Sequence, residues 1–300
     1  MKAVVVSKYG LPEGLRIIDV ETPRPRDSEI LIKIQATTVT FGDAMLRRMK
    51  FPVRMVFGLF IGGLGKNKIL GHELAGEVEA IGEEVTLFKP GDEIFGSTGM
   101  KGGAHAEYIC LPEDAMVAIK PANMSFEEAA AVPVGANTAL HILREGNIQP
   151  GHKVLVYGAS GSVGSYAVQL AKYWGAEVTT VSSTSNLEWL SELGADHTID
   201  YTKTDFTKTS ETYDVILDAV RKLSSSKCKG SLEENGIFLS SRTSTEEKVE
   251  NLIFLRELIE SSNIKAVIEK TFTFEEIVEA HRLVDTGRKK GNVVISLRQG

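Results

Sequence analysis

Apolar residues along the first 120 positions recur at the spacing of short strands. In EILIKIQA at 29–36, Ile30, Ile32 and Ile34 occupy alternate positions, which places their side chains on one face of a strand. A second apolar run, AVVV, stands at 3–6, and turns such as KPGD at 89–92 separate the segments. This part of the chain therefore predicts a glycine-rich, mostly β unit.

Two capping-box patterns, in which Ser or Thr is followed three residues later by Glu, predict helix starts. Ser125 and Glu128 precede an alanine-rich stretch, and Thr273 and Glu276 precede a stretch that runs to a glycine at 287. The last apolar run, VVISL at 293–297, is expected to be a strand.

Beyond residue 150 the pattern alternates between strands and helices. VLVY at 154–157 is a continuous apolar run, as in buried parallel strands, and apolar residues then recur at helical spacing. The further strand-like segments are EVTTVS (177–182), YDVILDAV (213–220) and NGIFLS (235–240), with helices expected near 186–193 and 246–260. This alternation predicts an α/β fold with a doubly wound parallel sheet.

Composition narrows the partners and the compartment. The 300 residues carry a net charge of −6 and no basic run longer than RKK at 288–290, which argues against nucleic acid or an anionic membrane as a partner. No apolar run reaches the roughly 18 residues that span a bilayer. Two cysteines, Cys110 and Cys228, cannot form a disulfide framework, so we expect a cytoplasmic protein. We interpret Cys228 as an ordinary surface thiol.

A glycine-rich loop lies between the apolar run VLVY and the helical pattern that follows it. Its residues are Gly158, Ala159, Ser160, Gly161, Ser162, Val163 and Gly164. Small residues in such a turn let the backbone approach a pyrophosphate at a helix N-terminus, whose free N–H groups stabilise negative charge. The order of strand, loop and helix therefore predicts a dinucleotide site.

The segment after the next strand favours NADPH over NADH. NAD sites place a carboxylate about 20 residues beyond the loop, to hold the ribose 2′-hydroxyl. Here that position carries Ser182, Ser183 and Thr184, whose hydroxyls can donate to a 2′-phosphate that a carboxylate would repel. Lys203, and Tyr201 as a stacking surface, are the nearest further candidates, and either can equally be a plain surface residue.

With these motifs in view, the chain resembles the medium-chain dehydrogenases/reductases, in their quinone oxidoreductase-like branch. The matching stretches include GHELAGEVEAIGEEVTLFKPGDEIFG, VYGASGSVGSYAVQLAKYWGAEVTTV, LGADHTIDY and GRKKGNVVISL. The resemblance implies a GroES-like β-rich catalytic domain at 1–121 and 273–300. It implies a Rossmann NAD(P)-binding domain at 122–272, shortened after residue 241.

The same resemblance allows the zinc ligands of the metal-dependent relatives to be compared position by position. A catalytic zinc needs three protein ligands. Thr40 stands where zinc relatives have cysteine, His72 of the GHE triplet matches the histidine ligand, and Val134 stands at the third position. We therefore expect no metal, and we interpret Gly71 and Gly76 as sites of close backbone approach.

For a zinc-free member, the resemblance implies hydride transfer from NADPH to a quinone or an α,β-unsaturated carbonyl. It places Thr138 near the nicotinamide, Thr40 and Asp43 at the substrate end, and Asn292 in the cofactor site. A nucleotide-binding, non-catalytic redox sensor or interaction protein on the same fold is the alternative, and a zinc alcohol dehydrogenase is a more distant one.

Two departures from the family pattern bear on activity and assembly. Arg221 replaces a glycine close to the cofactor; it can crowd the nicotinamide ribose, pair with a phosphate or point to solvent. Only RTSTEE separates FLSS (238–241) from the next helix, so an edge strand is missing and the protein can be a monomer or a homodimer. The apolar insert at 55–65 can be a substrate lid or a packed loop.

Overall fold

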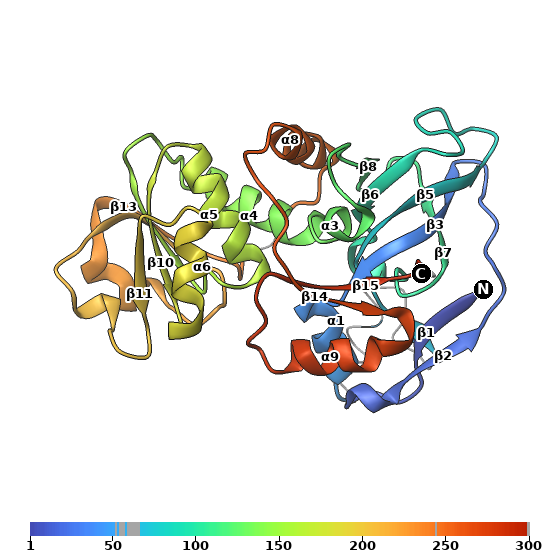
Figure 1. The fold of residues 1–300 in the computed structure, drawn as a ribbon, viewed down its shortest axis with the longest axis horizontal. Coiled ribbons are helices and arrows are strands. Elements are labelled where there is room, and N and C mark those ends of the chain that lie inside the picture. The colour runs from blue at the N-terminus through green and yellow to red at the C-terminus, as the bar shows by residue number, and fades with distance from the viewer. Residues whose placement is uncertain (52, 54–57, 59–66, 244, 299–300) are drawn as a thin grey trace. The chain divides into compact units, whose positions relative to one another are not determined.

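The computed structural model describes residues 1–51, 53, 58, 67–243 and 245–298. These fall into two compact units (Figure 1). The first comprises Met1–Val134, Glu247–Glu260 and Ile268–Gly300, and the second comprises Gly135–Glu246 and Ser261–Val267. The expected division assigns residues 122–134, 247–260 and 268–272 to the Rossmann domain, whereas the structure groups them with the first unit. The division into family domains stays a prediction. Apart from Gly58, the insert at 55–65 lies outside the described residues.

The first unit contains a seven-stranded sheet and a three-stranded sheet. The larger has the order β14-β15-β3-β5-β6-β8, with β7 also paired to β3, and the smaller has the order β2-β1-β4. The strands are β1 (Lys2–Val6), β2 (Leu15–Asp19), β3 (Glu29–Thr38), β4 (Lys68–Ile69), β5 (Glu73–Ile81), β6 (Glu93–Ser97), β7 (Tyr108–Pro112), β8 (Val117–Ile119), β14 (Ile268–Thr273) and β15 (Asn292–Ser296). The mostly β character predicted for this region is confirmed.

Strand β3 lies inside this sheet, between β15 and β5. Its apolar residues alternate as the sequence predicted. Ile30, Ile32 and Ile34 are buried, and β3 pairs antiparallel with β5 along most of its length. A Cβ on Gly76 would lie 2.3 Å from the carbonyl oxygen of Lys33, so only glycine allows the two backbones to approach this closely. The interpretation of Gly76 is thus confirmed.

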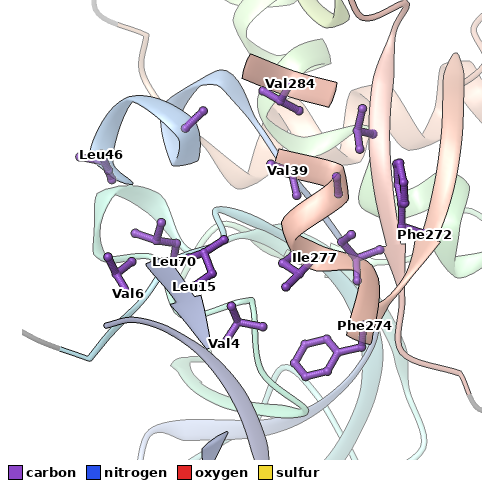
Figure 2. Packing of buried hydrophobic residues seen from close by; sticks show 14 residues of the cluster. Val4, Val6, Leu15, Val39, Leu46, Leu70, Phe272, Phe274, Ile277 and Val284 are labelled. Atoms are coloured by element: carbon purple, nitrogen blue, oxygen red, sulfur yellow. The ribbon is translucent and has the colours of Figure 1, made fainter. Parts of the chain in front are cut away.

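The first unit also contains helices and 3-10 turns. They are α1 (Phe41–Arg48), α3 (Phe126–Ala130), α8 (Val249–Glu260) and α9 (Ile277–Asp285), with 3-10 turns η1 (Pro12–Gly14), η2 (Gly99–Lys101) and η6 (Phe274–Glu276). Both predicted capping boxes form, at Ser125–Glu128 and at Thr273–Glu276. Figure 2 shows the apolar cluster around α9, which includes Ile277 of this helix, Phe272 of β14, and Val4 and Val6 of β1.

The second unit is the predicted doubly wound domain. Its five-stranded sheet has the order β11-β10-β9-β12-β13, and every neighbouring pair is parallel. Its strands are β9 (Lys153–Tyr157), β10 (Glu177–Ser182), β11 (His197–Asp200), β12 (Tyr213–Asp218) and β13 (Leu232–Ser240). Its helices are α5 (Ser162–Tyr173), α6 (Leu187–Glu192) and α7 (Ser225–Cys228), with 3-10 turns η3 (Thr184–Asn186), η4 (Phe206–Lys208) and η5 (Lys229–Ser231); α4 (Pro133–Glu145) begins in the first unit.

The order of the strands reverses at β9, so that β10 lies on one side of it and β12 on the other. Open α/β sheets bind ligands at the carboxyl ends of strands beside such a reversal, and the glycine loop follows β9 directly. Strand β13 ends the sheet, as expected from the short segment after residue 241. Cys228, interpreted as a surface thiol, is instead completely buried in the core of this unit with Leu155 and Phe206; that interpretation is wrong.

Candidate functional site

Two of the three glycines in the loop after β9 have a steric reason to be glycine. Gly158 has a φ of +78°, and a Cβ there would lie 2.4 Å from the Val220 side chain. A Cβ on Gly164 would lie 2.4 Å from the carbonyl oxygen of Gly158, so this glycine allows α5 to pack closely on the loop. Gly161 is different, because the nearest atom to its Cβ position is 3.8 Å away. The space beside Gly161 is therefore open to an approaching ligand.

The N-terminus of α5 provides the complementary donors for that space. Gly161 occupies the N-cap position, and no side chain there accepts a hydrogen bond from the first turn. The backbone N–H of Ser165 donates to Gly161 at 2.9 Å and starts the intrahelical pattern, while the preceding N–H groups have no helical acceptor. An uncapped helix N-terminus beside an open glycine fits the pyrophosphate of a dinucleotide.

The carboxyl end of β10 lies directly beside the glycine loop. The N–H of Gly158 donates to Val181 O at 3.0 Å, and on the other side the N–H of Tyr201 donates to Ser182 O at 3.0 Å. The structure thus brings the loop, Ser182 and Tyr201 together, and their predicted role in binding the cofactor stays a prediction. Tyr201 is 53% exposed, which leaves its ring accessible.

Hydroxyl and carboxylate groups share the end of the neighbouring strand β11. Asp200 accepts hydrogen bonds from the hydroxyls of Thr184 and Thr202, and Lys203 Nζ lies 3.5 Å from its Oδ2. These hydrogen bonds lower the pKa of Asp200 to about 2. Lys203, which is 68% exposed, is thus already beside a carboxylate that reduces its attraction for a phosphate.

Arg221 lies in a backbone conformation that glycine adopts most easily. Its φ is +61°, and this explains why the family pattern has glycine at the position. The side chain is exposed; its Nε donates to Ser241 O at 3.0 Å, and the Arg221 carbonyl accepts from Arg242. Arg221 is therefore held to the segment after β13.

In the first unit, Thr40 and Asp43 form the capping box of α1. Thr40 Oγ1 accepts from the Asp43 N–H at 3.1 Å and donates to Asp43 Oδ2 at 2.6 Å. Asp43 has no exposed surface, and its Oδ1 accepts from the N–H of Gly71 at 2.8 Å. These contacts give both residues a local structural role, and their predicted catalytic role stays a prediction.

His72 completes this cluster, and its Nδ1 lies 2.7 Å from Asp43 Oδ1. Burial lowers the pKa of His72, but the charge of Asp43 and this hydrogen bond outweigh burial and raise it. Burial alone would raise the pKa of Asp43, and the charge of His72 holds it well below its ordinary value. With 14% of its side chain exposed, His72 is a fixed imidazole with a second nitrogen available for hydrogen bonding.

Glu73 is buried and joins two distant segments. Its carboxylate accepts a hydrogen bond from the Thr38 hydroxyl and another from the Val134 N–H at 2.7 Å, near the start of α4. Burial raises the pKa of Glu73 to about 7 although both hydrogen bonds lower it.

A second buried polar cluster, which the sequence did not reveal, supports the GHE triplet. The N–H of His105 donates to Leu70 O at 2.9 Å, and a Cβ on Gly71 would lie 2.6 Å from the His105 ring. The His105 ring meets His281 edge to face at 5.7 Å, and Arg47 Nε donates to His281 Nδ1 at 3.3 Å. The interpretation of Gly71 as a site of close approach is thereby confirmed.

The residues at the expected zinc positions do not supply a ligand set. Val134 offers no ligand atom and the Thr40 hydroxyl belongs to the α1 cap, which leaves the second ring nitrogen of His72 as the one ligand atom at these three positions. Within the described ranges, no group of three His, Cys, Asp or Glu residues is arranged to hold a metal ion.

The remaining predicted site residues are divided between the two units. Thr138 is half-buried on α4 within the second unit, and Asn292 is buried at the start of β15 in the first unit. Their predicted proximity to a cofactor therefore stays a prediction.

Comparisons with known proteins find a matching family for a large part of each unit. Residues 26–121 match the family described as Alcohol dehydrogenase GroES-like domain, and residues 162–283 match the family described as Zinc-binding dehydrogenase. The expected GroES-like and Rossmann architecture is thus confirmed.

Three similar proteins illustrate the relationship. The chain is 34% identical to 2-methylene-furan-3-one reductase of Solanum lycopersicum, over 98% of this chain and 79% of that protein. It is 30% identical to the chloroplastic NADPH-dependent alkenal/one oxidoreductase of Arabidopsis thaliana, with the same coverage. The structure of the quinone oxidoreductase from Coxiella burnetii superposes with a TM-score of 0.86 at 27% identity, over 99% of each chain. The chain therefore belongs to the medium-chain dehydrogenase/reductase superfamily, in its quinone oxidoreductase-like branch.

Proposed function

We propose that this protein is an NADPH-dependent oxidoreductase that reduces quinones or the C=C bond of α,β-unsaturated carbonyls. The observation that carries the proposal is the glycine loop, where open space at Gly161 meets the uncapped N-terminus of α5. The relatives named as an alkenal/one oxidoreductase and a quinone oxidoreductase support the substrate class. They do not favour the non-catalytic alternative.

The second unit supplies the residues that would hold the cofactor. The N–H groups of Ser162 and Val163 would bind the pyrophosphate, and the serines at the end of β10 would bind the adenosine ribose. Tyr201 would lie against the adenine, and Thr138 would contact the nicotinamide end. Bound NADPH supplies the hydride.

The first unit would hold and polarise the substrate. A conjugated substrate needs no Lewis acid to accept hydride, because the developing negative charge moves to its oxygen. We assign His72 as the group that donates a hydrogen bond or a proton to that oxygen, since Asp43 fixes its ring and favours its protonated form. Thr40 and Asp43 would then act by positioning the imidazole.

A steady-state screen tests this function. Purified protein is mixed with NADPH and, separately, with an enone, a benzoquinone, and a saturated aldehyde, and the loss of NADPH absorbance is followed with and without a chelator. We expect oxidation of NADPH with the first two substrates, unaffected by the chelator. Activity that is confined to the aldehyde and its alcohol, and that the chelator abolishes, would overturn the proposal in favour of a zinc alcohol dehydrogenase.

We also propose a cytoplasmic location and a small-molecule partner. Cys110 and Cys228 are free thiols, which suits a reducing compartment. Among the described helices, none combines the length and apolar character needed to cross a bilayer. Cell fractionation with an antibody against the native protein would test the location.

A further inference from the structure

Asn186 occupies the N-cap position of α6, but its side chain does not cap that helix. Its Nδ2 donates to Ser182 Oγ and to Ser183 Oγ, each at 3.0 Å, and its Oδ1 accepts from Trp189 Nε1 at 3.2 Å. Asn usually caps a helix by accepting from a backbone N–H of the first turn. This side chain therefore serves the two serines instead, and at 6% exposure it is held in place by the fold.

The direction of these hydrogen bonds is fixed by Trp189. An indole N–H can only donate, so the oxygen of the Asn186 amide must face the tryptophan. The NH₂ group must then face the serines, and its two hydrogens serve one hydroxyl each.

This arrangement leaves the two serine hydroxyls as donors. A hydroxyl has one proton and two lone pairs, and accepting from Asn186 occupies one lone pair without using the proton. In the part of the chain that the structure describes, neither the Ser182 nor the Ser183 hydroxyl donates to a protein acceptor. The hydroxyl proton of the neighbouring Thr184, by contrast, is donated to Asp200.

The two serines lie at the strand end where the protein would recognise the adenosine ribose of a bound dinucleotide. Ser182 ends β10 beside the glycine loop, as shown by the hydrogen bond from Gly158 to Val181, and it also accepts from Tyr201 through its backbone. A donor pair at this position suits an acceptor-rich, anionic group on the ribose. Lys203 contributes less, because it is exposed and lies beside Asp200.

We propose that Asn186 is a positioning residue that presents the hydroxyls of Ser182 and Ser183 as donors to the 2′-phosphate of NADPH. This inference rests on the proposed dinucleotide-binding function and assigns its cofactor preference to the Trp189–Asn186–serine chain of hydrogen bonds. Asn186 acts through the serines and does not itself contact the phosphate.

The test is calorimetric binding of NADP⁺, NAD⁺ and 2′,5′-ADP to the full chain and to single variants. In Asn186→Asp, the new carboxylate accepts the serine protons, so we expect affinity for NADP⁺ and 2′,5′-ADP to fall about tenfold or more while NAD⁺ changes less than about threefold. Trp189→Phe removes the anchoring N–H, and Ser183→Ala removes one donor. Each should lower the ratio of the NADP⁺ affinity to the NAD⁺ affinity by about threefold. Asn235→Asp, an exposed site on β13 with the same charge change, is the matched control and should leave the ratio unchanged.

The outcomes separate this inference from the proposed function. If the native chain binds neither dinucleotide, both are overturned. If it binds NADP⁺ and the ratio of the two affinities is unchanged in Asn186→Asp, Trp189→Phe and Ser183→Ala, only the role of Asn186 is overturned. Equal weakening of NADP⁺ and NAD⁺ in Asn186→Asp and Ser183→Ala would also overturn it, because a purely structural role predicts that result. Should Asn186→Asp fail to fold, Trp189→Phe and Ser183→Ala still decide the question.

Discussion

Asp43 Oδ1 lies 2.7 Å from His72 Nδ1, and the same carboxylate also accepts from the N–H of Gly71 and from the N–H of Thr40, the N-cap residue of helix α1. One completely buried side chain thus joins the start of a helix to the GHE triplet. The ring of this histidine, which matches a zinc ligand of metal-dependent relatives, is fixed here by the Asp43 carboxylate. This relationship makes Asp43 the first position to test.

Replacing Asp43 with asparagine should destabilise the protein by about 3 kcal/mol and lower the pKa of His72. The amide can accept on only one side, so a donor on the other side of the buried group loses its partner. The His72 pKa should fall because the negative charge that raises it is gone. Urea denaturation and an NMR titration of the His72 ring would measure the two effects. Asp19→Asn, at an exposed site, makes the same change in net charge. It should change neither the stability nor the pKa of His72.

Glu73 predicts a specific dependence of stability on pH. Its pKa is raised from 4.5 to about 7 in the fold, so the folded protein holds this proton more tightly than the unfolded chain does. Stability from this group is complete below about pH 4.5 and is lost as the pH rises through about 7. Glu73→Gln cannot ionise, so its unfolding free energy relative to the native chain should rise by about 3 kcal/mol between about pH 4.5 and 8.

Urea denaturation of the two proteins across that pH range measures this difference. Glu79→Gln, at an exposed position on the same strand β5, is the matched control. A difference between Glu73→Gln and the native chain that stays constant with pH would show that the Glu73 pKa is not raised in the fold.

Two glycines of the nucleotide loop should respond in opposite ways to alanine. Gly161→Ala meets open space and has an ordinary φ of −81°, so stability should change by less than about 0.5 kcal/mol while NADP⁺ binding is lost. Gly164→Ala places a Cβ against the carbonyl of Gly158 and should destabilise the second unit by about 2 kcal/mol or more. Thermal denaturation paired with calorimetric binding distinguishes the two; undiminished binding by a folded Gly161→Ala would argue against this loop as the phosphate site.

Arg221 allows a test of backbone strain. Because its φ is +61°, the Gly variant should be more stable than the Ala variant by about 1 kcal/mol, the reverse of the usual order. Both variants lose the same hydrogen bond to Ser241. The difference between their free energies of unfolding therefore reports the backbone strain alone. Denaturant midpoints of the two variants measure it, and an Ala variant at least as stable as the Gly variant would show that this φ carries no strain.

The sequence by itself determined the features that depend on local chemistry. The alternation of Ile30, Ile32 and Ile34, the capping boxes at Ser125 and Thr273, and the strand–glycine loop–helix order at 154–164 all form as predicted. Each depends on residues close together in the chain, where backbone geometry limits the possible structures. The parallel five-stranded sheet follows from the same alternation repeated along the second unit.

Only the tertiary structure decided which distant groups meet. Asp43 and His72 are 29 positions apart, Glu73 and Val134 are 61 apart, and Arg47 and His281 are 234 apart. No spacing rule predicts such pairs, because packing selects the partners of a buried polar group after the chain has folded. The same reason explains the burial of Cys228 and the grouping of α8 with the first unit. The pattern of residues thus determined the strand–glycine loop–helix unit that we propose as the nucleotide site, and tertiary packing determined which side chains are fixed beside the GHE triplet.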